Sequence, residues 1–167
     1  MTGRKKKVEP SRKIIIGVIG GSMALPDDAK TARELGKLLA SKGYVVLTGG
    51  LTGIMEEVSR GAWEKEGITV GILPGTSPED ANPYVNIPIV TGLSHARNVL
   101  IVRSADVIVA IGGGLGTLSE IAIALKIGKQ VIGINTWDVD ERIIRVDDAT
   151  SAMEKIKKIL KEKNLIK

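Results

Sequence analysis

The sequence predicts a single α/β domain of the doubly wound type, with a mainly parallel sheet of six or seven strands. Short apolar runs rich in Ile and Val alternate with helical patterns along the chain, as they do in βαβ units. The runs are nearly continuous rather than alternating in polarity, as expected for strands that helices cover on both faces. Three of the runs end directly in glycine-rich turns, at the edge of the sheet where parallel α/β proteins bind ligands.

The expected elements follow one another in a regular order. The six expected strands are Ile14–Ile19, Tyr44–Leu47, Ile68–Leu73, Val85–Val90, Val107–Ile111 and Val131–Ile134. The five expected helices are Asp27–Lys42, Gly53–Glu66, Ser94–Ser104, Thr117–Ile127 and Ala149–Glu162. The first and last of these helices are apolar on one side and charged on the other, so each can cover the sheet. Residues 73–83 form the one extended loop expected, which can border a site.

The composition fits a globular domain and excludes several classes of site. The chain has 167 residues, of which 43% are hydrophobic and 26% charged, enough for one core. Cys is absent and His95 is the single histidine, so thiolate and multi-histidine metal sites are excluded and no metal is expected. Four aromatic residues are too few to stack single-stranded nucleic acid. No apolar stretch approaches the ~20 residues of a membrane helix, and we expect a soluble, cytoplasmic protein.

The net charge of +5 comes from the two ends of the chain. Residues 1–13 carry six basic residues against one acidic residue, and residues 154–167 carry six against two. The stretch between them has twelve basic and sixteen acidic residues, so the body of the protein is mildly acidic. We therefore expect a solvated basic tail over residues 1–12 and one domain over residues 13–167, without nucleic acid as a partner.

Glycine-rich turns follow the first, second and fifth expected strands. Their candidate ligand-binding residues are Gly20, Gly21, Ser22, Gly49, Gly50, Gly53, Gly112, Gly113, Gly114, Gly116 and Thr117. Glycine allows backbone N–H groups to approach a phosphate closely, and the start of the next helix favours negative charge. Three such turns at one edge predict a phosphate-binding site, although each turn alone could simply be a tight βα connection.

Two known phosphate motifs are absent. No Gly-x-x-x-x-Gly-Lys-Ser/Thr occurs, which excludes a P-loop. The first turn lacks the Gly-x-Gly-x-x-Gly fingerprint, and the second strand ends in Leu47-Thr48-Gly49 without an acid for a ribose. A mononucleotide or another phosphorylated small molecule therefore fits better than a nicotinamide dinucleotide.

Three polar residues near these turns are candidates for a chemical role. Arg97 lies in the first turn of an expected helix, where it can bind a phosphate, although a surface arginine or a structural ion pair is the alternative. Glu120 can act as a catalytic carboxylate or, with Thr117, form a capping box at the start of its helix. His95 lies beside Arg97, and packing or ligand contact is favoured over catalysis for it.

Three segments resemble motifs of the LOG-like proteins of the SLOG superfamily, a family often mislabelled as lysine decarboxylases. Residues 112–120, Gly-Gly-Gly-Leu-Gly-Thr-Leu-Ser-Glu, resemble the family's Pro-Gly-Gly-x-Gly-Thr-x-x-Glu. Residues 49–55, Gly-Gly-Leu-Thr-Gly-Ile-Met, are similar to its Gly-Gly-x-x-Gly-Leu-Met. Residues 94–98, Ser-His-Ala-Arg-Asn, are similar to its Met-His-x-Arg-Lys. The resemblance runs in register over about residues 14–135.

The resemblance implies a Rossmann-like, usually dimeric protein that hydrolyses the N-glycosidic bond of nucleoside 5′-monophosphates. Arg97 and Glu120 match the catalytic pair of that family, and the turns at 49–53 and 112–117 would bind the phosphate. The carboxylate would stabilise an oxocarbenium-like transition state, and no cofactor would be required. No Schiff-base lysine motif accompanies these residues, so lysine decarboxylation is not expected.

The departures from the family pattern point to a second branch. Ser94 replaces Met, Asn98 replaces Lys, and Ser119 replaces the usual first acid. The Arg-Asn pair and the triple glycine resemble the molybdenum cofactor carrier proteins, which implies binding of an anionic phosphopterin without turnover. A carrier or sensor of a nucleotide or of the molybdenum cofactor is therefore the alternative to a hydrolase. A DNA-handling protein related to DprA is a third hypothesis, against which the acidic body and scarce aromatic residues count.

Overall fold

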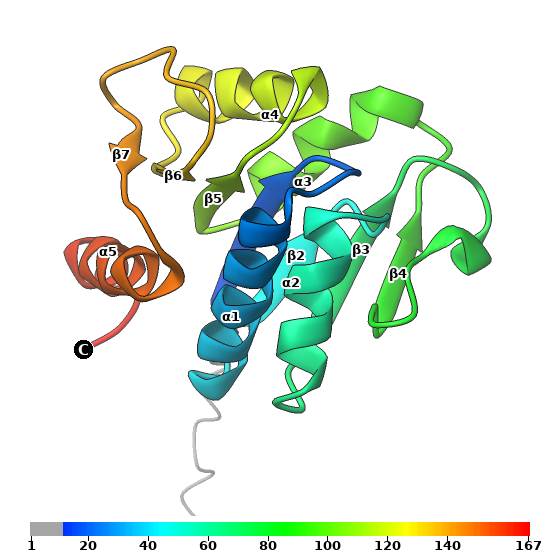
Figure 1. Cartoon of the computed structure of the whole chain (residues 1–167), viewed down its shortest axis with the longest axis horizontal. Coiled ribbons are helices and arrows are strands. Elements are labelled where there is room, and N and C mark those ends of the chain that lie inside the picture. The colour runs from blue at the N-terminus through cyan, green and yellow to red at the C-terminus, as the bar shows by residue number, and fades with distance from the viewer. Residues whose placement is uncertain (1–11) are drawn as a thin grey trace, which may run out of the picture.

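This computed structural model describes residues 12–167. These residues fold around a seven-stranded sheet (Figure 1). Its strands are β1 (Ile15–Gly20), β2 (Val45–Thr48), β3 (Thr69–Leu73), β4 (Ile87–Val90), β5 (Val107–Ile111), β6 (Val131–Ile134) and β7 (Ile144–Arg145). They lie in the order β4-β3-β2-β1-β5-β6-β7, and each pair of neighbours is parallel. The predicted parallel α/β fold is confirmed.

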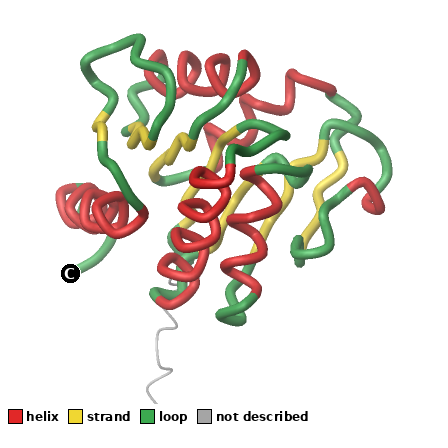
Figure 2. The backbone as a smooth tube through the Cα atoms, viewed as in Figure 1, coloured by secondary structure: helices red, strands yellow, loops and turns green. Residues whose placement is uncertain are grey.

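Helices cover both faces of this sheet (Figure 2). They are α1 (Pro26–Ser41), α2 (Ile54–Trp63), α3 (Asn98–Ser104), α4 (Leu115–Lys126) and α5 (Ala149–Glu162), with short 3-10 turns η1 (Pro78–Asp80) and η2 (Ser94–Arg97). The central strand β5 is buried throughout, and its successive side chains alternate between the two faces. Val107 and Val109 pack with α1, α2 and α5, whereas Ile108 and Ala110 pack with α3 and α4. A continuous apolar run is therefore needed, as the sequence indicated.

The structure differs from the expected elements at several points, among them β4, which begins at Ile87 rather than Val85. Strand β7 has only two residues and is too short to give a recognisable pattern. The helix expected over Ser94–Ser104 is divided: Ser94–Arg97 form the 3-10 turn η2, and the α-helix α3 begins only at Asn98. Helix α4 begins at Leu115, two residues before the expected start at Thr117. The last of these differences changes the interpretation of Glu120.

The strand order places a switch point between β1 and β5. The chain builds the sheet from β1 outward to β4, then returns through α3 to pair β5 with the other edge of β1. Loops that follow β1 and β5 therefore leave the sheet toward opposite faces, which opens a crevice at the carboxyl ends of these strands. Two of the three glycine-rich turns lie beside this crevice.

At the opposite end of the sheet, Asp106 connects the first described residues to the rest of the domain. Its carboxylate accepts hydrogen bonds from the Arg12 guanidinium at 2.7 and 2.9 Å and from the Ile15 N–H at 2.9 Å. Burial by itself would raise the pKa of Asp106, but these hydrogen bonds hold it below its ordinary value. Lys163 also donates to the Asp106 carbonyl at 3.0 Å. The rest of the expected basic tail, residues 1–11, lies outside the described residues.

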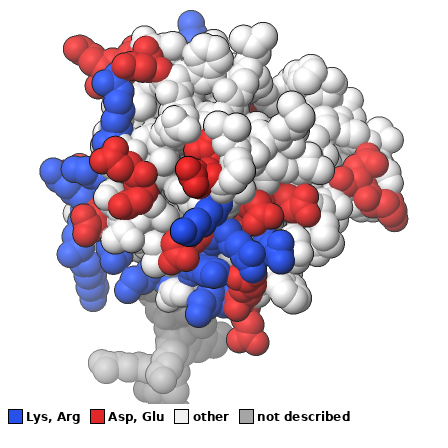
Figure 3. Space-filling view, viewed as in Figure 1, with Lys and Arg blue, Asp and Glu red and all other residues white. Residues whose placement is uncertain are grey.

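The charged side chains are unevenly distributed over the visible face of the molecule. Lys and Arg gather over α1, α2 and α5, whereas the region near α3 and α4 is mainly uncharged (Figure 3). No helix within residues 12–167 is long and apolar enough to cross a membrane.

Candidate functional site

A cavity of about 320 Å³ lies at the carboxyl ends of β1, β2 and β5, beside the switch point. Backbone from the glycine turns forms much of its wall, and η2, α3 and α4 supply its polar side chains. The lining residues are Ile19, Gly20, Gly21, Ser22, Gly49, Met55, His95, Arg97, Asn98, Gly114, Leu115, Gly116, Thr117 and Glu120. The cavity therefore brings together residues that are up to about a hundred positions apart in the sequence.

Most of the residues expected from the sequence line this cavity, but four glycines do not. Gly50 and Gly53 have left-handed φ angles of 76° and 69°, and they shape the turn after β2 from outside the cavity. At Gly53, an added Cβ would lie 2.5 Å from the Ser22 carbonyl carbon, so glycine lets the first two turns pack together. Gly112 and Gly113 face a neighbouring cavity instead.

Gly114 and Gly116 are glycines that packing does not require. A Cβ added at either position would meet nothing within 4 Å, and neither residue has a left-handed φ. Both residues line the cavity at the start of α4, where the first backbone N–H groups of a helix have no intrahelical partner. Glycine at these positions therefore leaves the start of α4 open to an anion in the cavity.

Arg97 is fixed at the inner wall of the cavity. Its side chain is about 9% exposed; its Nη1 donates to Asn98 Oδ1 at 2.7 Å and its Nη2 to the Gly49 carbonyl at 3.4 Å. The Nε atom is buried and has no hydrogen-bond partner among the residues described. An added Cβ at Gly49 would lie 2.6 Å from Nη2, so glycine is needed there for the guanidinium to take this place.

Glu120 projects from α4 toward Arg97. One of its carboxylate oxygens lies 3.8 Å from Arg97 Nη1, and both side chains are more than nine-tenths buried. Burial raises the pKa of Glu120 to about 7, and the positive charge of Arg97 offsets only part of this effect. Burial also lowers the pKa of Arg97, which Glu120 partly opposes. The site thus holds a carboxyl group that changes charge near neutral pH.

Of the two alternatives for Glu120, the capping box is wrong. Gly114 precedes the first residue of α4 and makes no side-chain cap, and Leu118 N–H already bonds to its carbonyl at 3.0 Å. Thr117 is consequently the third residue of the helix and Glu120 the sixth, so neither stands where a capping box requires it. The Gly114-Leu115-Gly116 segment, which looked like the end of a turn, is the start of the helix.

Asn98 belongs to the site although it was not among the expected site residues. Besides accepting from Arg97, Asn98 donates from Nδ2 to Ser119 Oγ at 3.1 Å, and Ser119 donates to the Gly116 carbonyl at 2.7 Å. The two departures from the LOG-like pattern at positions 98 and 119 therefore form one neutral pair that holds Arg97 against α4. The signal in the sequence that could have identified this pair is that positions 98 and 119 both depart from the LOG-like pattern.

His95 and the long loop have peripheral positions. His95 lines the mouth of the cavity and is exposed, as is Leu115, which is 77% exposed. The loop over residues 73–83 does not line the cavity. Its Asn82 donates to the carbonyls of Gly50 at 3.2 Å and Leu51 at 2.8 Å, so the loop supports the second glycine turn from behind.

The strand order, the glycine-lined cavity and the buried Arg–Glu pair define a Rossmann-like protein of the LOG-like class. More narrowly, the chain belongs to the SLOG cluster4 family, whose sequence profile matches residues 13–164.

Solved structures similar to this chain include two proteins that are described as binding or carrying the molybdenum cofactor. The molybdenum cofactor binding protein from Rippkaea orientalis is 44% identical, with a TM-score of 0.86. The molybdenum cofactor carrier protein from Chlamydomonas reinhardtii is 38% identical, with a TM-score of 0.83. Each alignment covers 90% of this chain and 99% of the other. The expected likeness to the carrier branch is confirmed.

Enzymes of the LOG type are similar over a smaller share of their length. The cytokinin riboside 5′-monophosphate phosphoribohydrolase LOG from Oryza sativa subsp. japonica is 33% identical over 134 residues, which are 75% of this chain and 54% of the rice protein. The chain thus spans about half the length of that relative. The DNA processing protein A from Streptococcus pneumoniae is 16% identical with a TM-score of 0.68, a likeness of fold alone.

Proposed function

We propose that this protein binds a phosphorylated, nucleotide-like small molecule in the cavity beside the switch point. The main support is that Gly114 and Gly116 leave the start of α4 exposed to the cavity, although packing does not require glycine at either position. The guanidinium of Arg97, which its hydrogen bonds hold in place, lines the same cavity. A phosphate placed there would receive hydrogen bonds from backbone N–H groups and from Arg97, and Thr117 could add its hydroxyl. The wall of the cavity at the end of β1 would be formed by Gly20, Gly21 and Ser22.

The primary form of this proposal is a carrier that holds an anionic cofactor such as the molybdenum cofactor without converting it. Support comes from similarity over nearly the whole length of the two carrier-type structures, against half the length of the rice enzyme. The site itself agrees with this, because the neutral Asn98–Ser119 pair replaces a charged pair without adding a reactive group.

A second form is hydrolysis of nucleoside 5′-monophosphates, and one observation favours it. Glu120 does not cap its helix, yet it is buried beside Arg97 in the cavity wall. In its ionised form the carboxylate would stabilise an oxocarbenium-like transition state and orient a water molecule for attack on the anomeric carbon. Arg97 would hold the ribose phosphate, and the products would be the free base and ribose 5-phosphate.

The two forms predict opposite responses to pH. A protonated Glu120 carries no charge to oppose a phosphate, so binding should strengthen as the pH falls from 8 to 6 through the pKa of about 7. Hydrolysis needs the ionised carboxylate, so turnover should instead rise over the same interval toward pH 8. Calorimetric titration and product analysis over this range measure the two responses separately.

The test begins with a panel of nucleoside 5′-monophosphates, with free base and ribose 5-phosphate followed by chromatography. Release that disappears in Glu120→Gln supports the hydrolase, and binding without release supports the carrier. Arg97→Ala should weaken binding of each phosphorylated compound about tenfold or more, as expected for a charge-assisted contact. Arg103→Ala, at an exposed position on α3, is the matched control. Equal affinity of Arg97→Ala and wild type would remove Arg97 from the site.

We further propose that the chain forms a homodimer through the segment 87–100. Exposed apolar side chains are concentrated there, in the edge strand β4 and in the turn and helix that follow it. They are Ile87, Ile89, Val90, Leu93, Val99 and Leu100, each between 36% and 49% exposed. Apolar groups concentrated in this way are typical of a surface that another protein covers.

A further inference from the structure

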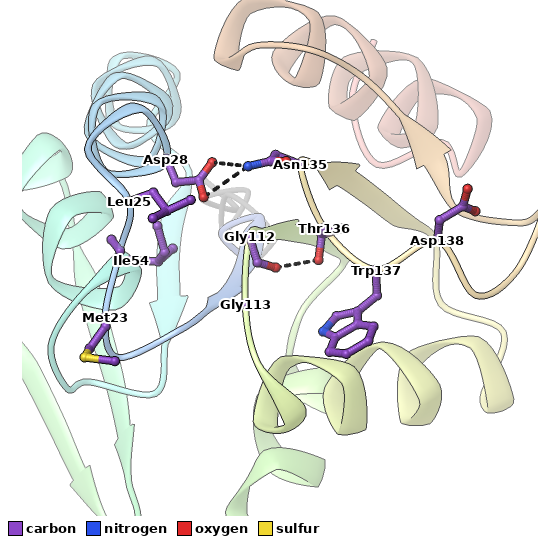
Figure 4. A pocket seen from close by; sticks show the side chains of 11 residues that line it. Met23, Leu25, Asp28, Ile54, Gly112, Gly113, Asn135, Thr136, Trp137 and Asp138 are labelled. Atoms are coloured by element: carbon purple, nitrogen blue, oxygen red, sulfur yellow. Dashed lines mark hydrogen bonds between the residues drawn. The ribbon is translucent and has the colours of Figure 1, made fainter.

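A second cavity, of about 570 Å³ (Figure 4), lies on the other side of the glycine turns from the first. It lies between the loop that follows β1, the first turn of α1 and the segment that follows β6. Cavities of this size accommodate small-molecule ligands. The proposed phosphate site does not use it.

The second cavity lacks the positive charge that Arg97 gives to the first. Among the residues described, its lining contains Asp28 and Asp138 and no Lys or Arg. Asp138 is exposed and pairs with Arg145, so Asp28 is the carboxylate that characterises the interior. A phosphate would be repelled here, whereas a neutral or cationic hydrogen-bond donor would be attracted.

Asp28 is held in place but retains acceptor capacity. Its side chain lies in the first turn of α1, the residue is 6% exposed, and Asn135 Nδ2 donates to its two oxygens at 3.0 and 3.3 Å (Figure 4). A carboxylate can accept about four hydrogen bonds, so one amide group leaves positions for a ligand. At Gly112 an added Cβ would lie 2.7 Å from Asp28 Oδ2, so glycine leaves room for the carboxylate.

An aromatic ring and apolar groups line the same cavity as this carboxylate. Trp137 lines the cavity, and its indole is oriented by a hydrogen bond from Nε1 to the Gly114 carbonyl at 3.1 Å. Met23 and Leu25 lie at the rim and are 91% and 66% exposed, so their apolar surfaces are available for contact. A cavity that contains a carboxylate, an aromatic ring and exposed aliphatic groups suits a planar heterocycle that carries N–H donors on its edge.

The two cavities meet at a ridge of backbone. Gly21 lines the first and Gly113 the second, and a Cβ built on Gly21 would lie 3.7 Å from the Gly113 Cα. The segment 112–117 contributes Gly113 to one cavity and Gly114 to the other. A ligand with its phosphate in the first cavity would therefore cross backbone without side chains to reach the second.

We propose that the second cavity binds the heterocycle of the ligand and selects rings with a 2-amino-4-oxo edge, the edge that guanine and pterins share. Two adjacent donors, the ring N–H and the amino group, would meet the two oxygens of Asp28, and Trp137 would contact the ring. This inference rests on the proposed phosphate site. It adds the class of ring that the site prefers.

The test is calorimetric titration with GMP, IMP and AMP, which share the ribose 5-phosphate and differ on the ring edge. GMP offers both donors and IMP only the ring N–H, whereas AMP presents an acceptor at that ring position. We expect GMP to bind about tenfold more tightly than AMP, with IMP between them. Asp28→Asn should abolish this order, and Asp138→Asn in the same cavity should preserve it. Trp137→Leu should weaken GMP binding several-fold and provides a second variant if Asp28→Asn does not fold.

The outcomes separate this inference from the proposed function. Equal affinities for the three nucleotides would overturn the inference and leave the phosphate site intact, as would an unchanged order in Asp28→Asn. If none of the three binds, the proposed nucleotide site fails, and pterin without a phosphate then decides the inference. Pterin binding that Asp28→Asn removes supports the second cavity as a ring site, and its failure to bind overturns it.

Discussion

Replacing Glu120 by Gln should make the protein more stable at pH 8, although it removes a charged partner of Arg97. The pKa of this carboxyl group is raised from 4.5 to about 7 in the folded protein, mainly by burial. Between these two values the folded state binds more protons than the unfolded state, so stability falls as the pH rises. The difference between the folded and unfolded pKa values of Glu120 corresponds to ~3 kcal/mol of folding stability, which is lost once the pH is above 7.

Gln has nearly the shape of the protonated carboxyl group and no charge to desolvate. At pH 8 we therefore expect Glu120→Gln to unfold with a free energy ~3 kcal/mol higher than wild type, or a Tm higher by about 6 to 12 °C. At pH 5 the difference should shrink to about 1 kcal/mol, because the folded carboxyl group is then protonated. Guanidinium unfolding at both pH values measures these differences, and Glu154→Gln on the exposed side of α5 is the control.

The reasoning would be refuted by a variant that is less stable than wild type at pH 8, or by a difference that does not change with pH. The first result would mean that the ion pair with Arg97 outweighs burial. A loss of stability of ~1 kcal/mol at every pH would indicate the role of a helix cap, which the start of α4 at Leu115 argues against.

Three further predictions concern the N-terminal region of the chain and the apolar segment 87–100. Asp106→Ala should lower the free energy of unfolding by ~2 kcal/mol, because Ile15 N–H and Arg12 lose their acceptor, and an unchanged urea midpoint would contradict this. Wild type should lose the same contribution in acid, as the pH falls through the lowered pKa of Asp106. Deletion of residues 1–11, which leaves Arg12 in place, should preserve the Tm, and a chain that no longer folds would disprove the expected dispensable tail. Leu100→Asp should convert the proposed dimer to a monomer in light scattering, whereas a monomeric wild type would rule the dimer out.

Much of the fold was predictable because its signals are local. The Val-Ile runs of β1 and β5 and the two-sided polarity of α1 and α5 report whether each segment is covered on one face or both, and this follows from the residues themselves. Strand β7 was missed because two residues carry no period, and the helix expected over residues 94–104 instead starts as a 3-10 turn at the left-handed residue Ser94.

The candidate site was predictable in outline for a related reason. Parallel strands end at the same edge, so turns after β1, β2 and β5 had to approach one another, and Arg97 and Glu120 follow such strands. Which glycines line the cavity depended on the direction of each turn, which sequence patterns do not carry. The start of α4 was misplaced because two glycines ordinarily indicate a turn rather than the first turn of a helix.

The sequence by itself determined the class of fold, the edge of the sheet at which the glycine-rich turns meet and the arginine, Arg97, that is the candidate for a phosphate contact there. Tertiary structure decided that Glu120 is buried with a raised pKa, that Asn98 and Ser119 form one pair, and that Asp28 meets Asn135 across a second cavity. The physical reason is that periodicity and turn composition are properties of neighbouring residues. Burial, pKa and side-chain pairing depend on which distant segments pack together, and Asp28 and Asn135 are 107 residues apart in the chain.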